Sequence, residues 1–524
     1  MPFSCKAIHI HQGGAMIRYR PHLEGSAARF EPLWALAASS LIILGLLWPS
    51  CSAAFYPGLL AASFLIVARP CSRWTAYAFV APYFLLLGLA VWQPVFPWIT
   101  GLLLALLLGE LAGRLLYLLL RQAGHLRLLV LPCAWFCFDY AFARIPGFNR
   151  MQMIPLLAPV ALRTEALALC AAWGPSLVLF FLAAIAGALI LLVLRAAGCR
   201  VGDQRTVVLA GALLAAGCLA LGIGLAGYRA VPSSGRTVRI AVARGVPSRG
   251  SSVQTAEELA QYHQTRRDAY LALDWPADAD IYVLPETELG LWDRQNRIDQ
   301  AYRDAYLSLA RQLGGLTVLC VTEGDSVSQT DRHFSALLLD DTRFYGLSAK
   351  RFLVPFSESD RYTPGTRFDV YDTPAGKVGL AICYDFQGPT AGKLKANGAE
   401  LLLAPFNDSG FGRVYQHLHR TSVVMQAAQL ALPVAMANEG GIAQIVDGRG
   451  RILAERNGPG TGVIDETLML DSRQSLYLLF GRWAALAFAI ASAGWLFFLF
   501  ASGMVCFFRQ RTIRKLAGRK DRVD

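Results

Sequence analysis

The segment Val378-Gly-Leu-Ala-Ile-Cys-Tyr-Asp385 begins with a short apolar run that ends at Cys383. Runs of this length, bounded by turn residues, are typical of buried strands. Working outward from this segment, the same pattern recurs between residues 236 and 450, with helix-like segments between the runs. The expected strands lie at 238–243, 281–285, 316–321, 335–339, 368–371, 378–382, 401–404, 434–437 and 443–446, and the expected helices at 256–273, 297–313, 390–397 and 415–430. This alternation predicts a layered α/β domain with a core of its own.

Three reactive side chains follow or end short runs of residues, two of which are expected strands. Glu286 follows the run Ile281-Tyr-Val-Leu-Pro285, Lys350 follows Tyr345-Gly-Leu-Ser-Ala349, and Cys383 ends the apolar run that begins at Val378. Taken singly, they are most often a solvated turn residue, a surface charge and a small core residue. Together they can serve one reaction, in which a carboxylate deprotonates a thiol nucleophile and a lysine stabilises the oxyanion that develops on the attacked carbonyl.

The remainder of the chain has the composition of a membrane protein. Of 524 residues, 55% are hydrophobic and only 16% are charged, whereas soluble domains carry about 25% charged residues. Apolar segments long enough to be spanning candidates lie near 33–49, 53–68, 74–95, 98–120, 126–143, 175–194, 206–227 and 480–508. We therefore predict a membrane domain of about seven transmembrane helices at 1–228, a catalytic domain at 229–477, and a last helix with a basic tail at 478–524.

The formal net charge of +12 is distributed unevenly along the chain. Residues 229–477 carry a net charge of −3 and the rest carries +15. With a cytoplasmic N-terminus, 18 of the 23 lysines and arginines outside 229–477 fall on the cytoplasmic side, as the positive-inside rule requires. This orientation places both termini in the cytoplasm and 229–477 outside it. The polar part has no basic stripe, so we predict no nucleic-acid partner.

The eleven cysteines are scattered and show no zinc-type spacing. We predict no metal, no cofactor and no disulfide framework. His417 and His419 lie on an expected helix, and we interpret them as packing or capping residues.

The three reactive segments resemble the Glu-Lys-Cys motifs of the nitrilase, or carbon-nitrogen hydrolase, superfamily. With the layout of seven spans, a polar domain and one span, the chain resembles the bacterial apolipoprotein N-acyltransferase family within it. The matching stretches are Pro285-Glu-Thr287, Leu353-Val-Pro-Phe-Ser-Glu358, Ile382-Cys-Tyr-Asp385, Asn407-Asp408, Gln416-His-Leu418 and Ala437-Asn-Glu-Gly440. The departures are Ser357 for glycine, Asp385 for glutamate, Gly410 for tryptophan, and a domain opening at 243–247 without Gln-Gly-Asn.

The resemblance implies a membrane α-helical bundle of about eight transmembrane helices and an α-β-β-α sandwich domain. In that domain Glu286 is the general base, Lys350 the oxyanion stabiliser and Cys383 the nucleophile. Supporting residues are Glu358, Tyr384 and Asp385, and substrate-binding residues are Asn407 and Asn438.

The implied reaction takes place at the bacterial inner membrane, with the catalytic domain on the periplasmic side of a monomeric enzyme. An acyl chain moves from a membrane phospholipid to the cysteine as a thioester. It then moves to the N-terminal amine of a diacylglyceryl-cysteine apolipoprotein.

Two alternatives use the same three side chains. One is a membrane-tethered nitrilase-type amidase that hydrolyses a small amide. The other is a divergent acyltransferase paralogue with another acceptor, which the departures leave open. A third possibility, a transporter or scaffold with an inactive enzyme domain, is opposed by the intact Glu286, Lys350 and Cys383.

Overall fold

The structure is a computed structural model that describes residues 31–47, 49–68, 72–91, 97–142, 144, 162–199, 201–230, 236–245, 255–293, 300–324, 332–354 and 357–520. It divides into two compact units. The first comprises Met1–Tyr140, Ser176–Gly222 and Trp483–Asp524, and the second comprises Ala141–Pro175 and Ile223–Arg482. The boundaries at 228 and 477 stay predictions, and the expected departure at residues 246 and 247 lies outside the described residues.

The first unit is helical, and a helix coincides with each of the eight apolar segments. These helices are α1 (Glu31–Leu47), α2 (Phe55–Ala68), α3 (Arg73–Val91), α4 (Pro97–Gln122), α5 (Val130–Phe142), α7 (Pro175–Ala196), α8 (Gln204–Ala230) and α13 (Arg482–Lys520), of which α5, α7, α8 and α13 have terminal residues in the second unit. Within the described residues, three helical segments are long and apolar enough to cross a membrane: Pro175–Ala196, Gln204–Arg229 and Tyr477–Cys506. The count of eight spans stays a prediction.

The second unit is built on a twelve-stranded sheet. The strands are β1 (Thr237–Gly245), β2 (Ile281–Asp293), β3 (Leu316–Gly324), β4 (His333–Leu339), β5 (Phe344–Ala349), β6 (Val370–Thr373), β7 (Gly376–Leu380), β8 (Leu401–Asn407), β9 (Val434–Glu439), β10 (Ala443–Val446), β11 (Ile452–Arg456) and β12 (Gly462–Met469). Their order is β5-β4-β3-β2-β1-β9-β8-β7-β6, with β12 beside β1 and β10 between β9 and β11. The central strands, from β3 through β1 and β9 to β7, are all parallel.

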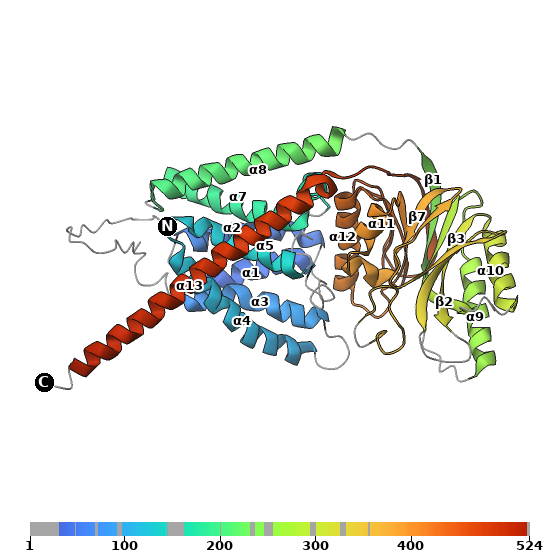
Figure 1. Cartoon of the computed structure of the whole chain (residues 1–524), viewed down its shortest axis with the longest axis horizontal. Coiled ribbons are helices and arrows are strands. Elements are labelled where there is room, and N and C mark those ends of the chain that lie inside the picture. Colours follow the sequence, from blue (N-terminus) through green and yellow to red (C-terminus); the bar gives the residue numbers. More distant parts are fainter. Residues whose placement is uncertain are drawn as a thin grey trace. The chain divides into compact units, whose positions relative to one another are not determined.

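Helices cover both faces of this sheet (Figure 1). On one side lie α9 (Ala256–Leu271) and α10 (Gln300–Leu313), and on the other lie α11 (Thr390–Ala396) and α12 (Arg413–Leu430). Because side chains alternate along a strand, Leu319 and Val321 pack with Tyr306 of α10, whereas Val318 and Cys320 belong to the core shared with α11 and α12. The predicted layered α/β domain is confirmed.

The structure corrects the expected strand ends next to two of the reactive residues. Glu286 does not follow β2 but lies inside it, where the pairing with β3 loses register between Val283 and Glu288. Such irregularities re-aim side chains and are common beside active sites. Strand β7 ends at Leu380, two residues earlier than expected, so Cys383 lies beyond the strand. An apolar run identifies a buried strand, but it does not show where the hydrogen-bonded ladder stops.

Candidate active site

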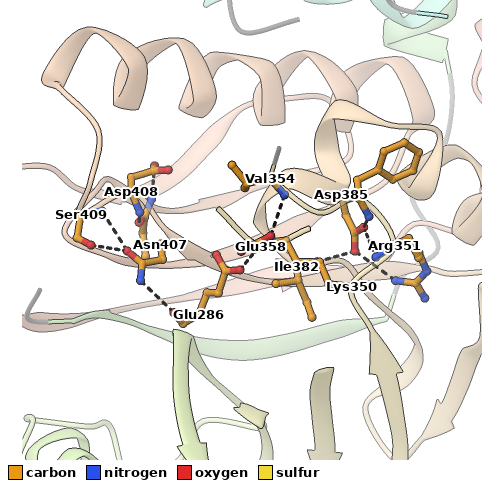
Figure 2. A network of polar contacts seen from close by, with 12 residues as sticks. Glu286, Lys350, Arg351, Val354, Glu358, Ile382, Asp385, Asn407, Asp408 and Ser409 are labelled. Carbon is orange, nitrogen blue, oxygen red and sulfur yellow. Dashed lines mark hydrogen bonds and ion pairs between the residues drawn. The ribbon is translucent and has the colours of Figure 1, made fainter. Parts of the chain in front are cut away.

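Lys350 is the first residue after β5, and its ammonium group lies between two carboxylates (Figure 2). Its Nζ donates a hydrogen bond of 2.6 Å to Oε1 of Glu286 and one of 2.7 Å to Oε1 of Glu358. The second oxygen of Glu358 accepts the backbone N–H of Val354 at 2.9 Å. The lysine is buried, at 1% exposed. The two ion pairs therefore fix its position with little competition from water.

The charges in this group set the protonation states. Burial raises the pKa of the Glu286 carboxyl to about 7; the Lys350 cation acts against this rise and Glu358 adds to it. Burial by itself lowers the pKa of Lys350, but Glu286 and Glu358 outweigh it, and the pKa of Lys350 is raised. At neutral pH the lysine is thus a cation and Glu286 is near its midpoint, where a general base works best.

Cys383 occupies a conformation that is rare for a residue with a side chain. It begins the short helix η5 (Cys383–Gln387) with φ of 40°, and such backbone conformations cluster at functional sites. Its thiol hydrogen-bonds to the Glu286 side chain and to the backbone of Asn407. Burial, and then the charge of Glu286, raise the pKa of the thiol, while Lys350 lowers it. The thiol therefore needs a base before it can attack.

Asp385 joins the loop of the lysine to the loop of the cysteine. One of its oxygens accepts the backbone N–H groups of Arg351 and Phe352 at 2.8 and 2.9 Å, and the other accepts the N–H of Ile382 at 3.0 Å. The guanidinium group of Arg351, which is also buried, lies 3.4 Å from the same carboxylate. Asp385, which stands where the resembled family has glutamate, thus still accepts several charge-assisted hydrogen bonds.

Replacing Asp385 by alanine is expected to destabilise this unit. The change leaves Arg351 buried without its counter-ion and frees three backbone N–H groups, which costs about 3–5 kcal/mol. At about 2–4 °C per kcal/mol, the thermal midpoint of the detergent-solubilised chain should fall by about 6–20 °C. Asp372→Ala is the matched control, since the Asp372 side chain is 86% exposed, and an equal fall in both variants would contradict the assignment.

The two predicted substrate-binding asparagines differ in their surroundings. Asn407, at the end of β8, donates to the backbone oxygen of Glu286 at 3.2 Å and accepts from Ser409. Asn438 is fully buried, and its amide donates to Asp408 and to the backbone of Ile442. Asn438 therefore fixes the loop that follows β8 through a buried hydrogen bond to Asp408. The substrate-binding roles stay predictions, as does the supporting role of Tyr384, the buried second residue of η5.

Sequence reasoning missed the pairing of Asp408 with His419. Both are buried, and Nδ1 of His419 lies 3.0 Å from Oδ1 of Asp408. The sequence offered only an Asn-Asp pair after a strand and two histidines on a helix, with nothing to show which histidine faces the site. His417 lies on the same helix and is only partly buried.

Comparison with known proteins finds a family that matches most of this unit. Residues 239–477 match the model of the carbon-nitrogen hydrolase family. This part of the chain is therefore similar to carbon-nitrogen hydrolase domains, and its fold is built on a sheet with helices on both faces. Among solved structures, Saccharomyces cerevisiae Nit3, a nitrilase-superfamily member, is 20% identical with a TM-score of 0.34, covering 45% of this chain and 90% of that one.

The resemblance to apolipoprotein N-acyltransferases is confirmed. The enzyme so named from Geobacter metallireducens is 25% identical over 292 residues, which are 50% of this chain and 54% of that protein. The one from Allorhizobium ampelinum is 24% identical over 330 residues, which are 56% and 60% of the two chains. A deaminated glutathione amidase of Yersinia enterocolitica is 29% identical over 128 residues, covering 22% of this chain and 44% of that protein. The chain spans about half the length of the curated relatives it matches.

Proposed function

We propose that this protein is an N-acyltransferase that moves an acyl chain from a membrane phospholipid to the N-terminal amine of diacylglyceryl-cysteine apolipoproteins. The observation that carries the proposal is the buried contact of Lys350 with Glu286 next to the thiol of Cys383. The relatives with this activity in their names support the reaction class. The long apolar helices support a lipid substrate.

In the first half-reaction, the Glu286 carboxylate takes the thiol proton of Cys383, and the sulfur attacks the ester carbonyl of the phospholipid. Lys350 donates a hydrogen bond to the oxygen that becomes negative, as in an oxyanion hole. The tetrahedral intermediate collapses, the C–O bond breaks, and the lysophospholipid alkoxide takes the proton back from Glu286. A thioester on Cys383 remains.

In the second half-reaction, the neutral N-terminal amine of the apolipoprotein attacks the thioester carbonyl. Glu286 accepts the proton that the amine loses, and Lys350 again stabilises the oxyanion. The C–S bond breaks, and the Cys383 thiolate regains a proton from Glu286. One base and one cation thus serve both halves because the same carbonyl carbon is attacked in each.

The proposed location is the bacterial inner membrane, with residues 229–477 on the periplasmic side, both termini in the cytoplasm and a monomeric chain. The asymmetry of lysine and arginine supports this orientation.

The decisive experiment is rescue of a bacterial strain depleted of its own lipoprotein N-acyltransferase. Expression of the native chain is expected to restore growth and N-acylated lipoproteins, detected by mass spectrometry of the lipoprotein N-terminus. The Cys383→Ser chain, at equal membrane levels, is expected to restore neither. Failure of the native chain, with normal membrane insertion, overturns the acceptor assignment.

Amide hydrolysis is the second candidate, because one relative is a deaminated glutathione amidase and the same three side chains can deliver an acyl group to water. The purified full chain should then release ammonia from small amides and form no thioester with phospholipid. Formation of a phospholipid-derived thioester that transfers to a diacylglyceryl peptide rules this candidate out.

The rate of thioester formation is expected to rise with pH through about 7 and then level off. The base must be ionised to take the thiol proton, and the pKa of Glu286 is raised to about 7, so the rate falls about tenfold per pH unit below that value. Single-turnover acylation measured from pH 5 to 9 tests this. In Glu286→Gln, a slow rate that keeps rising with pH and does not level off near 7 is expected, because the thiol must then ionise without the base; the same levelling near 7 in the variant contradicts the assignment.

A further inference from the structure

A second group of side chains meets Cys383 at its sulfur. Its Sγ, a carboxylate oxygen of Asp408 and a ring nitrogen of His419 all lie within 4.8 Å of one another, and the three residues are buried. Asp408 follows β8, and His419 comes from α12. The proposed acyl transfer uses Glu286 and Lys350 and leaves Asp408 and His419 without a chemical role.

The second nitrogen of His419 is unusual for a buried polar atom. Nδ1 faces Asp408 at 3.0 Å, while Nε2 is buried and has no hydrogen-bond partner among the described residues. The ring packs between Phe406 and Tyr415, with ring centroids 4.6 and 5.2 Å away. Buried polar atoms are normally satisfied, and one that is not calls for an explanation.

Thiolate, imidazole and carboxylate are the ligand types that Zn²⁺ selects in proteins. Bond lengths of about 2.3 Å to sulfur and 2.0–2.1 Å to nitrogen and oxygen, at tetrahedral angles, place the ligand atoms about 3.3–3.6 Å apart. In this structure the nitrogen and oxygen are 3.0 Å apart, and no pair exceeds 4.8 Å. Shifts of about 1 Å therefore bring the three atoms onto one ion.

The surrounding charge favours a cation at this place. The carboxylates of Glu286 and Asp408 act on the Cys383 thiol, and the nearby cation Lys350 is already shared by Glu286 and Glu358. Two positive charges on an entering ion offset this excess of negative charge.

We propose that Cys383, Asp408 and His419 form an inhibitory site for Zn²⁺. The ion replaces the thiol proton of Cys383, which leaves to solvent, and takes Nδ1 of His419, whose ring proton moves to Nε2. Water completes the tetrahedron. With its sulfur on the metal, Cys383 cannot attack a carbonyl, so the ion blocks the reaction until it is removed. The loss of activity rests on the proposed function, whereas the binding of the ion does not.

The test measures protection of one thiol and needs no turnover. The full chain in detergent is freed of metal with a chelator, and alkylation of Cys383 by iodoacetamide is followed by mass spectrometry with and without micromolar Zn²⁺. The ion is expected to slow alkylation at least about 10-fold in the native chain and in the control His417→Asn. In His419→Asn, the concentration of Zn²⁺ that protects half of Cys383 from alkylation should rise at least about 10-fold. Losing one residue around a bound metal typically weakens metal binding by this much.

Asparagine is chosen because its amide can still donate to Asp408, so the variant keeps the pairing that holds the loop. Equal protection in the native chain and in His419→Asn overturns the site, since it places the ion on the thiol alone. So does the absence of protection in the native chain.

A spectrum keeps the proposal testable if His419→Asn does not fold. Co²⁺ added to the native chain is expected to give a thiolate-to-cobalt charge-transfer band in the near ultraviolet, which Cys383→Ser loses. No difference between the two spectra overturns the site. Reversal of Zn²⁺ inhibition by chelator in the acyl-transfer assay is the functional readout. If acyl transfer is never observed, the two binding measurements still decide the metal site.

Discussion

Cys383→Ser is expected to eliminate the acyl-enzyme and to lower acyl transfer by at least about 10⁴-fold. Serine has nearly the same volume, so the buried site, where Cys383 is 3% exposed, keeps its packing. Its hydroxyl is a far weaker acid than a thiol, and a carboxylate with a pKa of about 7 does not deprotonate it. The nucleophile is lost while the fold remains.

The measurement uses a phospholipid labelled in its acyl chains. Label that stays on the denatured native chain, and is released by hydroxylamine, reports the thioester. Cys320→Ser is the matched control because Cys320 of β3 lies buried in the same core and has no part in the mechanism. Retention of label on Cys383→Ser, or its loss from Cys320→Ser, contradicts the assignment of the nucleophile.

Lys350→Met is expected to have the second-largest effect, because one ammonium group supports two carboxylates. Loss of an oxyanion donor costs about 10²–10³-fold in the rate of the chemical step. Without the cation the pKa of Glu286 rises further above 7, so the base is protonated at neutral pH, which removes about another tenfold per pKa unit. Breaking a buried ion pair also lowers the free energy of unfolding by about 3–5 kcal/mol.

The experiment separates the chemical loss from the structural one. Acylation is measured at saturating phospholipid, and the unfolding midpoint is measured in the same detergent. The double change Lys350→Met with Glu358→Gln removes one of the two unpaired charges, so the midpoint should recover in part while the rate stays low. Lys377→Met is the control, since this β7 lysine is 56% exposed. A near-native rate in Lys350→Met refutes the oxyanion role.

The apolar runs predicted most of the sheet because its central strands are buried on both faces. Strands β5, β11 and β12 were not predicted. Their residues are mainly half-buried or exposed, so they lack the continuous apolar run of a central strand. Strand β12 is fixed by its antiparallel pairing with β1, in which Arg239 meets Asp465 through 2.7 and 2.9 Å hydrogen bonds. A partner more than 200 residues away leaves no local signal.

The sequence by itself indicated a similarity to carbon-nitrogen hydrolases, because the short motifs around Glu286, Lys350 and Cys383 are recognisable from their residue types and neighbours alone. Its apolar segments likewise determined where the long helices lie. Only the tertiary structure decided that Lys350 is shared by two glutamates, that Asp385 joins the two loops, and that Asp408 and His419 reach the sulfur of Cys383. These contacts join residues from separate strands and loops. Their distances, and the burial that raises the pKa of Glu286 to about 7, exist only when the whole sheet has formed.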